Sequence, residues 1–168
     1  MILFWIFAIV VFAFGWVVFR GAPYVPSQNR YIKRALEELY PLNSRDVLVD
    51  VGSGDGVVLR WAAHYGARAV GYELNPILVV ISRFMSRRHS NVRVELVDFW
   101  TTNVPNDTTV VYAFLVTRDV KKMMKKMQTE ATRLNRTLYF ISYGNVLPGM
   151  KPDKTLDAYG LYSFYPLH

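Results

Sequence analysis

The stretch VLVDVGSGDGVVL, residues 47–59, places a glycine-rich turn directly after a short apolar run. The run is compact and rich in β-branched residues, as expected of a buried strand, and the residues after the turn continue as a helix. Glycine at such a turn lets the chain bend tightly and lets a ligand approach the backbone, where a side chain would intrude. The stretch therefore predicts a strand–turn–helix unit that binds a small ligand at Gly52, Gly54 and Gly56.

Strand and helix signals alternate along the rest of the chain. Strands are predicted at 46–52, 67–73, 91–98, 108–115 and 137–143, and helices at about 56–65, 76–89 and 119–134. This alternation predicts an α/β fold, a Rossmann-like, doubly wound, mostly parallel sheet with helices on both faces. The C-terminal stretch LDAYGLYSFYPL is aromatic and predicts a last, antiparallel strand. A ligand then binds at the C-terminal ends of the strands, where the glycine turn lies.

The first 19 residues, MILFWIFAIVVFAFGWVVF, carry no charged side chain and no proline. With a rise of about 1.5 Å per residue they would span most of a hydrocarbon core of roughly 30 Å, which favours one N-terminal transmembrane helix. A cleaved signal peptide and a buried helix are the alternatives; a signal peptide would need a basic start and small residues before its cleavage site. Because Arg20, Arg30, Lys33 and Arg34 all follow the helix, we expect a single-pass membrane protein whose domain faces the cytoplasm or, equivalently, the mitochondrial matrix.

The remaining residues suffice for one domain with its own core. We expect a membrane anchor at 1–19, a juxtamembrane segment with an amphipathic helix at 20–45, and the ligand-binding domain at 46–168. The net charge is +7 and cysteine is absent, which excludes disulfides, thiolate metal sites and a cysteine nucleophile. The basic residues fit an anionic membrane surface, and no nucleic-acid partner is expected because no aromatic motif is interleaved with them. His64, His89 and His168 show no ligand spacing, so no metal is expected.

Acidic residues at the ends of three successive predicted strands indicate the charge of the ligand. Asp50 and Asp55 lie in the glycine turn, where they would repel a pyrophosphate and suit a cation. The dinucleotide fingerprint would also need glycine at position 57, where this chain has Val57. Glu73 ends the second strand, at the spacing where an acid meets ribose hydroxyls, and Asp98 ends the third, where it could accept from an adenine amino group. A positively charged nucleoside therefore fits better than NAD.

With these motifs, the sequence resembles the class I, seven-strand S-adenosylmethionine-dependent methyltransferases. VDVGSGDG is similar to their first motif, AVGYELNP to the acidic motif that follows it, and VELVDFW to the strand and acid beside the adenine. Together with PYVPS before the first helix, these motifs resemble the small branch of membrane-anchored protein-lysine methyltransferases, which has eukaryotic mitochondrial members and prokaryotic relatives. The resemblance covers roughly residues 22–143.

The resemblance implies S-adenosyl-L-methionine as the cofactor and assigns residues to its parts. The implied binding residues are Tyr24, Pro26 and Ser27 over the cofactor, Asp50, Gly52, Ser53, Gly54, Asp55 and Gly56 at its methionine moiety, Glu73, Leu74 and Asn75 at the ribose, and Asp98 and Phe99 at the adenine. No catalytic residue is assigned, because a sulfonium methyl is already activated and needs only an aligned acceptor.

The resemblance also implies that the acceptor is a lysine of a membrane or membrane-associated protein. The chain departs from the family in three places: Val57 stands where relatives often have arginine, the tail is shorter than the usual two-strand ending, and AFLVTRD replaces the D-P-P-Y or N-P-P-Y element. Tyr143, Tyr159 and Tyr162 are either walls of a lysine channel or plain core. Methylation of a small molecule or lipid at the membrane, and a non-catalytic scaffold that binds the cofactor, remain as alternatives.

Overall fold

The structure, a computed structural model, describes residues 1, 3–5 and 29–167. Most of the predicted transmembrane helix lies outside these residues, as do the predicted cofactor residues Tyr24, Pro26 and Ser27. Within the described ranges, no helix combines the length and apolar character that crossing a bilayer requires.

From residue 29 onward the chain forms one mixed sheet covered by helices. The elements are α2 (Asn29–Arg34), the π-helix η1 (Ala35–Leu39), β1 (Val47–Val51), α3 (Val57–His64), β2 (Arg68–Glu73), α4 (Pro76–Met85), β3 (Val92–Leu96), β4 (Val110–Phe114), the short 3-10 helix η2 (Thr117–Asp119), α5 (Val120–Leu134), β5 (Leu138–Tyr143), β6 (Lys154–Leu156) and β7 (Tyr159–Phe164). The strand order is β3-β2-β1-β4-β5-β7-β6. Strands β1 to β5 are parallel, and β7 is antiparallel to both β5 and β6. The predicted doubly wound, mostly parallel α/β sheet is confirmed.

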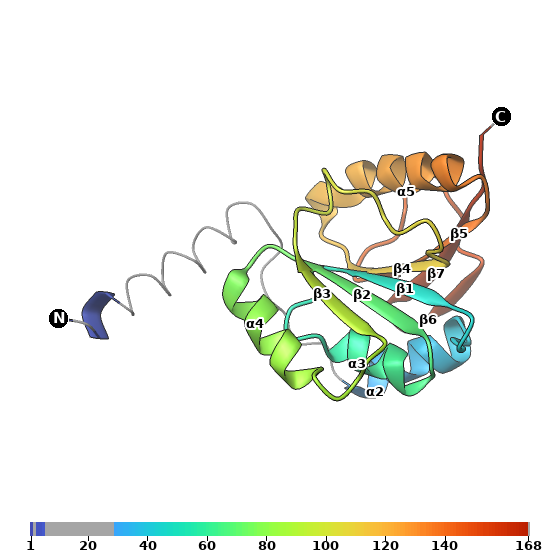
Figure 1. The fold of residues 1–168 in the computed structure, drawn as a ribbon. Coiled ribbons are helices and arrows are strands. Elements are labelled where there is room, and N and C mark those ends of the chain that lie inside the picture. Colours follow the sequence, from blue (N-terminus) through green and yellow to red (C-terminus); the bar gives the residue numbers. More distant parts are fainter. Residues whose placement is uncertain (2, 6–28, 168) are drawn as a thin grey trace.

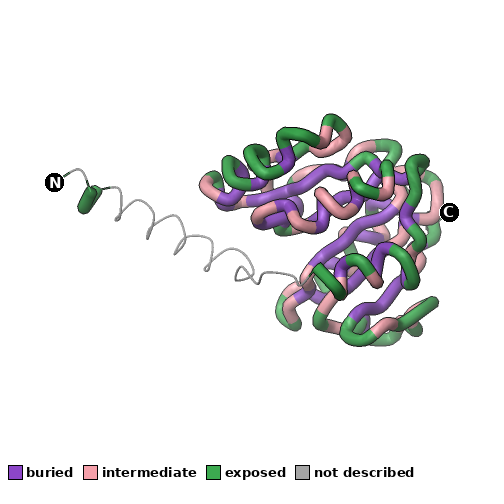
Figure 2. The backbone as a smooth tube through the Cα atoms, turned by 90° about the horizontal axis from the view of Figure 1, so that it is seen from below, coloured by how far each residue is buried: buried purple, intermediate pink, exposed green. Residues whose placement is uncertain are grey.

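Two apolar layers hold the helices on opposite faces of the sheet, with α2, α3 and α4 on one side and α5 on the other (Figure 1). Alternation along each strand creates both layers, because successive side chains point to opposite faces. In β1, Leu48 belongs to the layer of α2 and α3, and Val49 belongs to the layer of α5. Figure 2 shows buried backbone along the strands and exposed residues on the outer helical surfaces.

The predicted amphipathic helix before the first strand is present as α2 and η1, which together end at Leu39. Its apolar residues Ile32, Leu36 and Leu39 are almost completely buried against the sheet layer of α3. The described part of the segment 20–45 therefore packs into the same core as the strands that follow it.

The C-terminal end differs from the prediction of one last strand in a shortened tail, which is wrong. The chain ends in a hairpin of two strands, in which Leu156 of β6 pairs with Tyr159 of β7. Asp157 adopts a positive φ of 52° in the turn between them. The usual two-strand ending is thus present, because three residues are enough for β6 to pair along the edge of β7.

Candidate functional site

The glycine turn joins β1 to α3 at the C-terminal edge of the parallel strands, as the sequence predicts. Gly52 has a φ of 73°, and a Cβ added there would meet no atom within 4 Å. Gly56 has a φ of 81°, and a Cβ added there would lie 2.2 Å from Oγ of Ser82 on α4. Gly52 therefore leaves space beside the backbone for a ligand, whereas Gly56 allows α4 to approach the turn closely.

The carboxylate of Glu73 lies at the centre of the hydrogen bonds around the turn. It is buried at the end of β2, and its Oε2 accepts from the backbone N–H of Gly54 at 2.9 Å. Its Oε1 accepts from the backbone N–H groups of Leu74 and Asn75, both at 2.8 Å. A carboxylate has about four acceptor positions, so one position on Oε2 remains for a ligand hydroxyl.

Asp50 supplies a second buried carboxyl group next to this one. It lies on β1, opposite Gly71 of β2 and Tyr112 of β4. Burial raises the pKa of Asp50 well above its usual value, and the negative charges of Glu73 and Asp55 raise it further. A cation bound here would offset that repulsion and favour the ionised carboxylate, which is the property expected of a site for a positively charged ligand.

Two polar side chains beside the turn are buried without a hydrogen-bond partner among the described residues. They are Ser53, through Oγ, and Asn75, through Nδ2. Asn75 also caps α4, because its Oδ1 accepts from the backbone N–H of Ile77 at 2.9 Å. Buried polar groups are rarely left unpaired in native proteins, so these two atoms mark positions where a ligand can supply the missing partner.

Asp98 and Phe99, which follow β3, take different roles. Asp98 is partly exposed, and its Oδ1 accepts from the backbone N–H of Trp100 at 2.9 Å. The ring of Phe99 is buried in the α5 layer, with its centroid 6.3 Å from that of Tyr72 and 5.4 Å from that of Trp100. The structure thus leaves the carboxylate of Asp98 near the surface of the site and places the side chain of Phe99 in the core.

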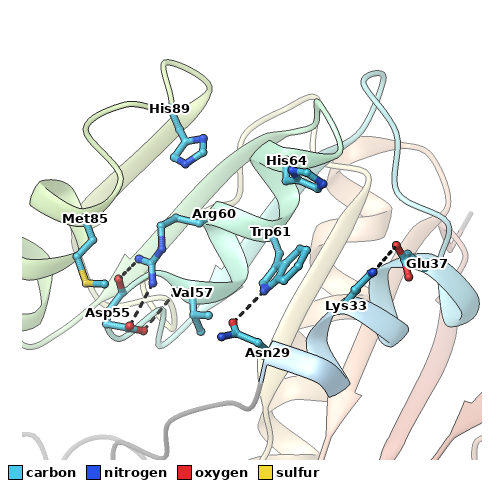
Figure 3. Close-up of a pocket in the computed structure, with 10 residues that line it drawn as sticks. All are labelled: Asn29, Lys33, Glu37, Asp55, Val57, Arg60, Trp61, His64, Met85 and His89. Atoms are coloured by element: carbon cyan, nitrogen blue, oxygen red, sulfur yellow. Dashed lines mark hydrogen bonds and ion pairs between the residues drawn. The ribbon is translucent and has the colours of Figure 1, made fainter.

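Asp55 is turned toward a neighbouring groove. Its Oδ2 lies 3.2 Å from Nη2 of Arg60, and both residues line an open groove of about 660 Å³ between α2, α3 and α4 (Figure 3). Sequence reasoning missed Arg60. The available signal was its spacing, because Arg60 follows Val57 by one helical turn and supplies a guanidinium close to the position where relatives often have arginine.

An aromatic stack lies beside Asp50 on the face of the sheet that carries α2 and α3. The rings of Tyr143 and Tyr159 are stacked with centroids 4.6 Å apart, and the hydroxyl of Tyr159 lies 3.3 Å from that of Tyr112. Burial raises the pKa of Tyr159 to about 12, and the negative charge of Asp50 contributes to the increase. Tyr162 belongs to the opposite layer, where its hydroxyl accepts from the backbone N–H of Leu147 at 3.1 Å. Two of the three tyrosines are therefore grouped near the site, and Tyr162 is a core residue.

Comparisons with known proteins agree with this geometry. The ANTKMT methyltransferase domain family matches residues 50–154 of the chain. An ATP synthase lysine N-methyltransferase from Xenopus laevis is 40% identical over 111 residues, which are 64% of this chain and 48% of that protein. An adenine nucleotide translocase lysine N-methyltransferase from Mus musculus is 33% identical over 112 residues, with the same coverage of 64% and 48%. The chain thus spans about half the length of the curated relatives it matches.

Solved structures show the same architecture. An RNA methyltransferase from Salinibacter ruber, crystallised with S-adenosyl-L-homocysteine, superposes with a TM-score of 0.73 at 26% identity and covers 86% of this chain and 95% of its own. The 23S rRNA methyltransferase ErmE superposes with a TM-score of 0.59 at 18% identity, over 71% of this chain and 48% of its own. The second likeness concerns the fold alone.

Proposed function

The chain belongs to the ANTKMT methyltransferase domain family, and we propose on this premise that it transfers methyl groups from S-adenosyl-L-methionine to a lysine of a membrane or membrane-associated protein. The observation that carries the proposal is the arrangement of Asp50, Gly54 and Glu73, in which two buried carboxyl groups flank a turn with open space beside its backbone. The named relatives that methylate lysine support the choice of acceptor.

The residues present fit this cofactor. The raised pKa of Asp50 indicates a site that favours positive charge, and the cofactor is a sulfonium cation with an ammonium group. Glu73 retains one acceptor position for a ribose hydroxyl. The unpaired Ser53 Oγ and Asn75 Nδ2 lie in the segments that the resemblance assigns to the methionine moiety and the ribose. In this proposal Asp98 accepts from the adenine, and Phe99 supports that position from the core.

When bound, the cofactor supplies an already activated methyl group. The task of the protein is then to align an acceptor nitrogen and to exclude water. We place the acceptor beside the Tyr143–Tyr159 stack, because Tyr143 is partly exposed at the end of β5 and Tyr159 lies within electrostatic reach of Asp50. Aromatic walls penalise the ammonium form of lysine and so favour the neutral amine that accepts a methyl group.

The apolar segment 1–19 is the basis for placing the enzyme at a membrane. We propose that it forms a single anchor and that the domain faces the cytoplasm or its matrix equivalent, since the nearby basic residues all follow the segment. The tether would raise the local concentration of membrane-bound acceptors. Protease added to right-side-out vesicles should leave the domain intact; digestion of the domain, or its release by a carbonate wash, would contradict the anchor.

The reaction is tested by supplying tritiated cofactor to membranes from cells that lack this protein, with wild-type enzyme or the Glu73→Ala variant. The expected result is label on the lysine of a membrane protein with the wild type and little label with the variant. Label in lipid or in a small metabolite would replace the lysine assignment by the small-molecule alternative, and label in RNA would replace it by nucleic-acid methylation. Cofactor binding without any transfer would indicate a scaffold.

A further inference from the structure

Helix α4 carries large apolar side chains on its outer surface. The exposed fractions are 66% for Val80, 40% for Ile81, 65% for Phe84 and 45% for Met85. Residues at spacings of three to five form one stripe on a helix, and the opposite side of α4 is buried through Leu78 and Val79. Contiguous exposed apolar side chains of this kind are typical of an interaction surface.

The surroundings of the stripe are basic. The stretch 76–91 contains Arg83, Arg87, Arg88 and His89 and no carboxylate. The guanidinium of Arg87 lies 4.2 Å from the ring centroid of Phe84, so its aliphatic stem runs along the apolar surface and its charge is at the edge. An apolar stripe bordered by arginines, with no acidic residue, is complementary to an anionic lipid surface.

The described chain begins on the same side of the molecule. Asn29, at the start of α2, lines the groove that Met85 and His89 of α4 also line (Figure 3). Asn29 is fixed there, because its Oδ1 accepts from Nε1 of Trp61 at 3.0 Å. The segment that precedes residue 29 therefore joins the domain beside the C-terminal end of α4.

The second basic helix has a different environment. Helix α5 covers the opposite face of the sheet, so α4 and α5 cannot both rest on one flat bilayer (Figure 1). Its apolar residues Met123 and Met127 are buried, and Lys126 is paired with the buried Glu130 at 2.6 Å. Charge alone does not distinguish the two helices, but only α4 combines charge with exposed apolar side chains.

We propose that the outer face of α4 docks on an anionic lipid bilayer, with Val80, Ile81 and Phe84 inserted at the interface and Arg87 and Arg88 at the headgroups. This contact is separate from the proposed anchor and from methyl transfer. It orients the domain with α2, α3 and α4 toward the lipid and α5 toward solvent.

The absence of cysteine allows a direct test with the full chain. Phe84→Cys and Lys125→Cys each introduce one thiol, on α4 and on α5, for an environment-sensitive fluorophore. Each labelled protein is reconstituted into phosphatidylcholine vesicles, with or without phosphatidylglycerol, that contain shallow nitroxide lipids. We expect several-fold stronger quenching at position 84 than at 125 in anionic vesicles, and a marked decrease at 84 when Arg87→Gln and Arg88→Gln are added.

Equal quenching at both positions would overturn the proposal, as would failure of the chain to associate with the vesicles. A blue-shifted probe at position 84 that nitroxide lipids do not quench would also overturn it, because a protein segment or a second copy would then cover the stripe. The measurement needs neither cofactor nor acceptor, so its outcome is independent of the proposed reaction.

Discussion

The backbone N–H of Gly54 donates to Oε2 of Glu73 at 2.9 Å, so the acid that ends β2 holds the turn that follows β1. Two further bonds support this link, because the N–H groups of Gly52 and Ser53 both donate to the carbonyl of Tyr72, at 2.8 and 3.1 Å. The turn and the carboxylate are therefore one unit, and a substitution in either should affect both ligand binding and local stability.

The first prediction concerns this unit. Glu73→Gln removes the charge that accepts three backbone N–H groups and a ligand hydroxyl. Loss of a charge-assisted hydrogen bond costs about 1.5–3 kcal/mol, so affinity for S-adenosyl-L-methionine should fall roughly ten- to a hundredfold by calorimetry. Glu95→Gln is the matched control, because Glu95 pairs with the exposed Arg93 at 2.9 Å on β3. Wild-type affinity in Glu73→Gln would contradict the assignment.

The second prediction is a double-mutant cycle between the turn and α4. Gly56→Ala combines an unfavourable positive φ, which costs roughly 1–2 kcal/mol, with a clash against Oγ of Ser82. Ser82→Ala alone should be nearly neutral, because Ser82 Oγ is buried without a described partner. In the Ser82→Ala background Gly56→Ala should therefore destabilise less, by about 1 kcal/mol in urea unfolding. Strict additivity would show that the two residues do not meet.

The third prediction is a pH dependence. Because burial raises the pKa of Asp50, the stability contributed by its protonated form is complete below the usual pKa of 3.8 and is lost as pH rises through the folded-state pKa. A cationic ligand favours the ionised form, so affinity should rise with pH over the same window, and binding should release a proton.

Calorimetry in two buffers of different ionisation enthalpy measures that proton. Asp50→Asn should abolish its release and remove the pH dependence. Asp55→Asn is the control that should retain most of the release, since Asp55 is paired with Arg60 in the groove. The same proton count in Asp50→Asn as in wild type would assign the titration to another group.

The fourth prediction separates acceptor from cofactor. Tyr143→Ala removes the partly exposed half of the stack with Tyr159, and kcat/KM for methylation of deficient membranes should fall roughly tenfold. The dissociation constant for the cofactor should stay within about twofold, because Tyr143 contributes no bond to the glycine turn. Tyr165→Ala, at an exposed tyrosine near the C-terminus, should leave both values unchanged. Parallel losses in binding and turnover would place Tyr143 in the cofactor site.

The sequence predicted the fold where hydrophobic pattern and turn chemistry agree. Strands β1 to β5 and helices α3, α4 and α5 all follow the predicted order, since each repeats its apolar residues at the spacing of its element. The hairpin at the C-terminus was not predicted in full, because β6 has only three residues, is mostly exposed at the sheet edge and shows no alternation. A strand of this length is defined by its partner and not by its own sequence.

The site was predicted in the same uneven way. The positions of Asp50, Gly54 and Glu73 follow from the rule that ligands bind at the C-terminal ends of parallel strands. The orientation of Asp55 toward Arg60 and the burial of the Phe99 ring depend on contacts across α3 and the α5 layer. Spacing along one element cannot reveal such contacts, because they involve residues from different parts of the fold.

Only Leu74 and Asn75 separate Glu73 from Pro76, the first residue of α4. The helix with the exposed apolar stripe thus begins where the turn-holding acid ends, and Gly56 lets Ser82 of the same helix approach that turn. Any displacement of α4 at a bilayer would reach both points of contact. Thermodynamic linkage then requires reciprocity: if lipid composition changes the affinity for the cofactor by some factor, cofactor binding changes the affinity for that lipid surface by the same factor.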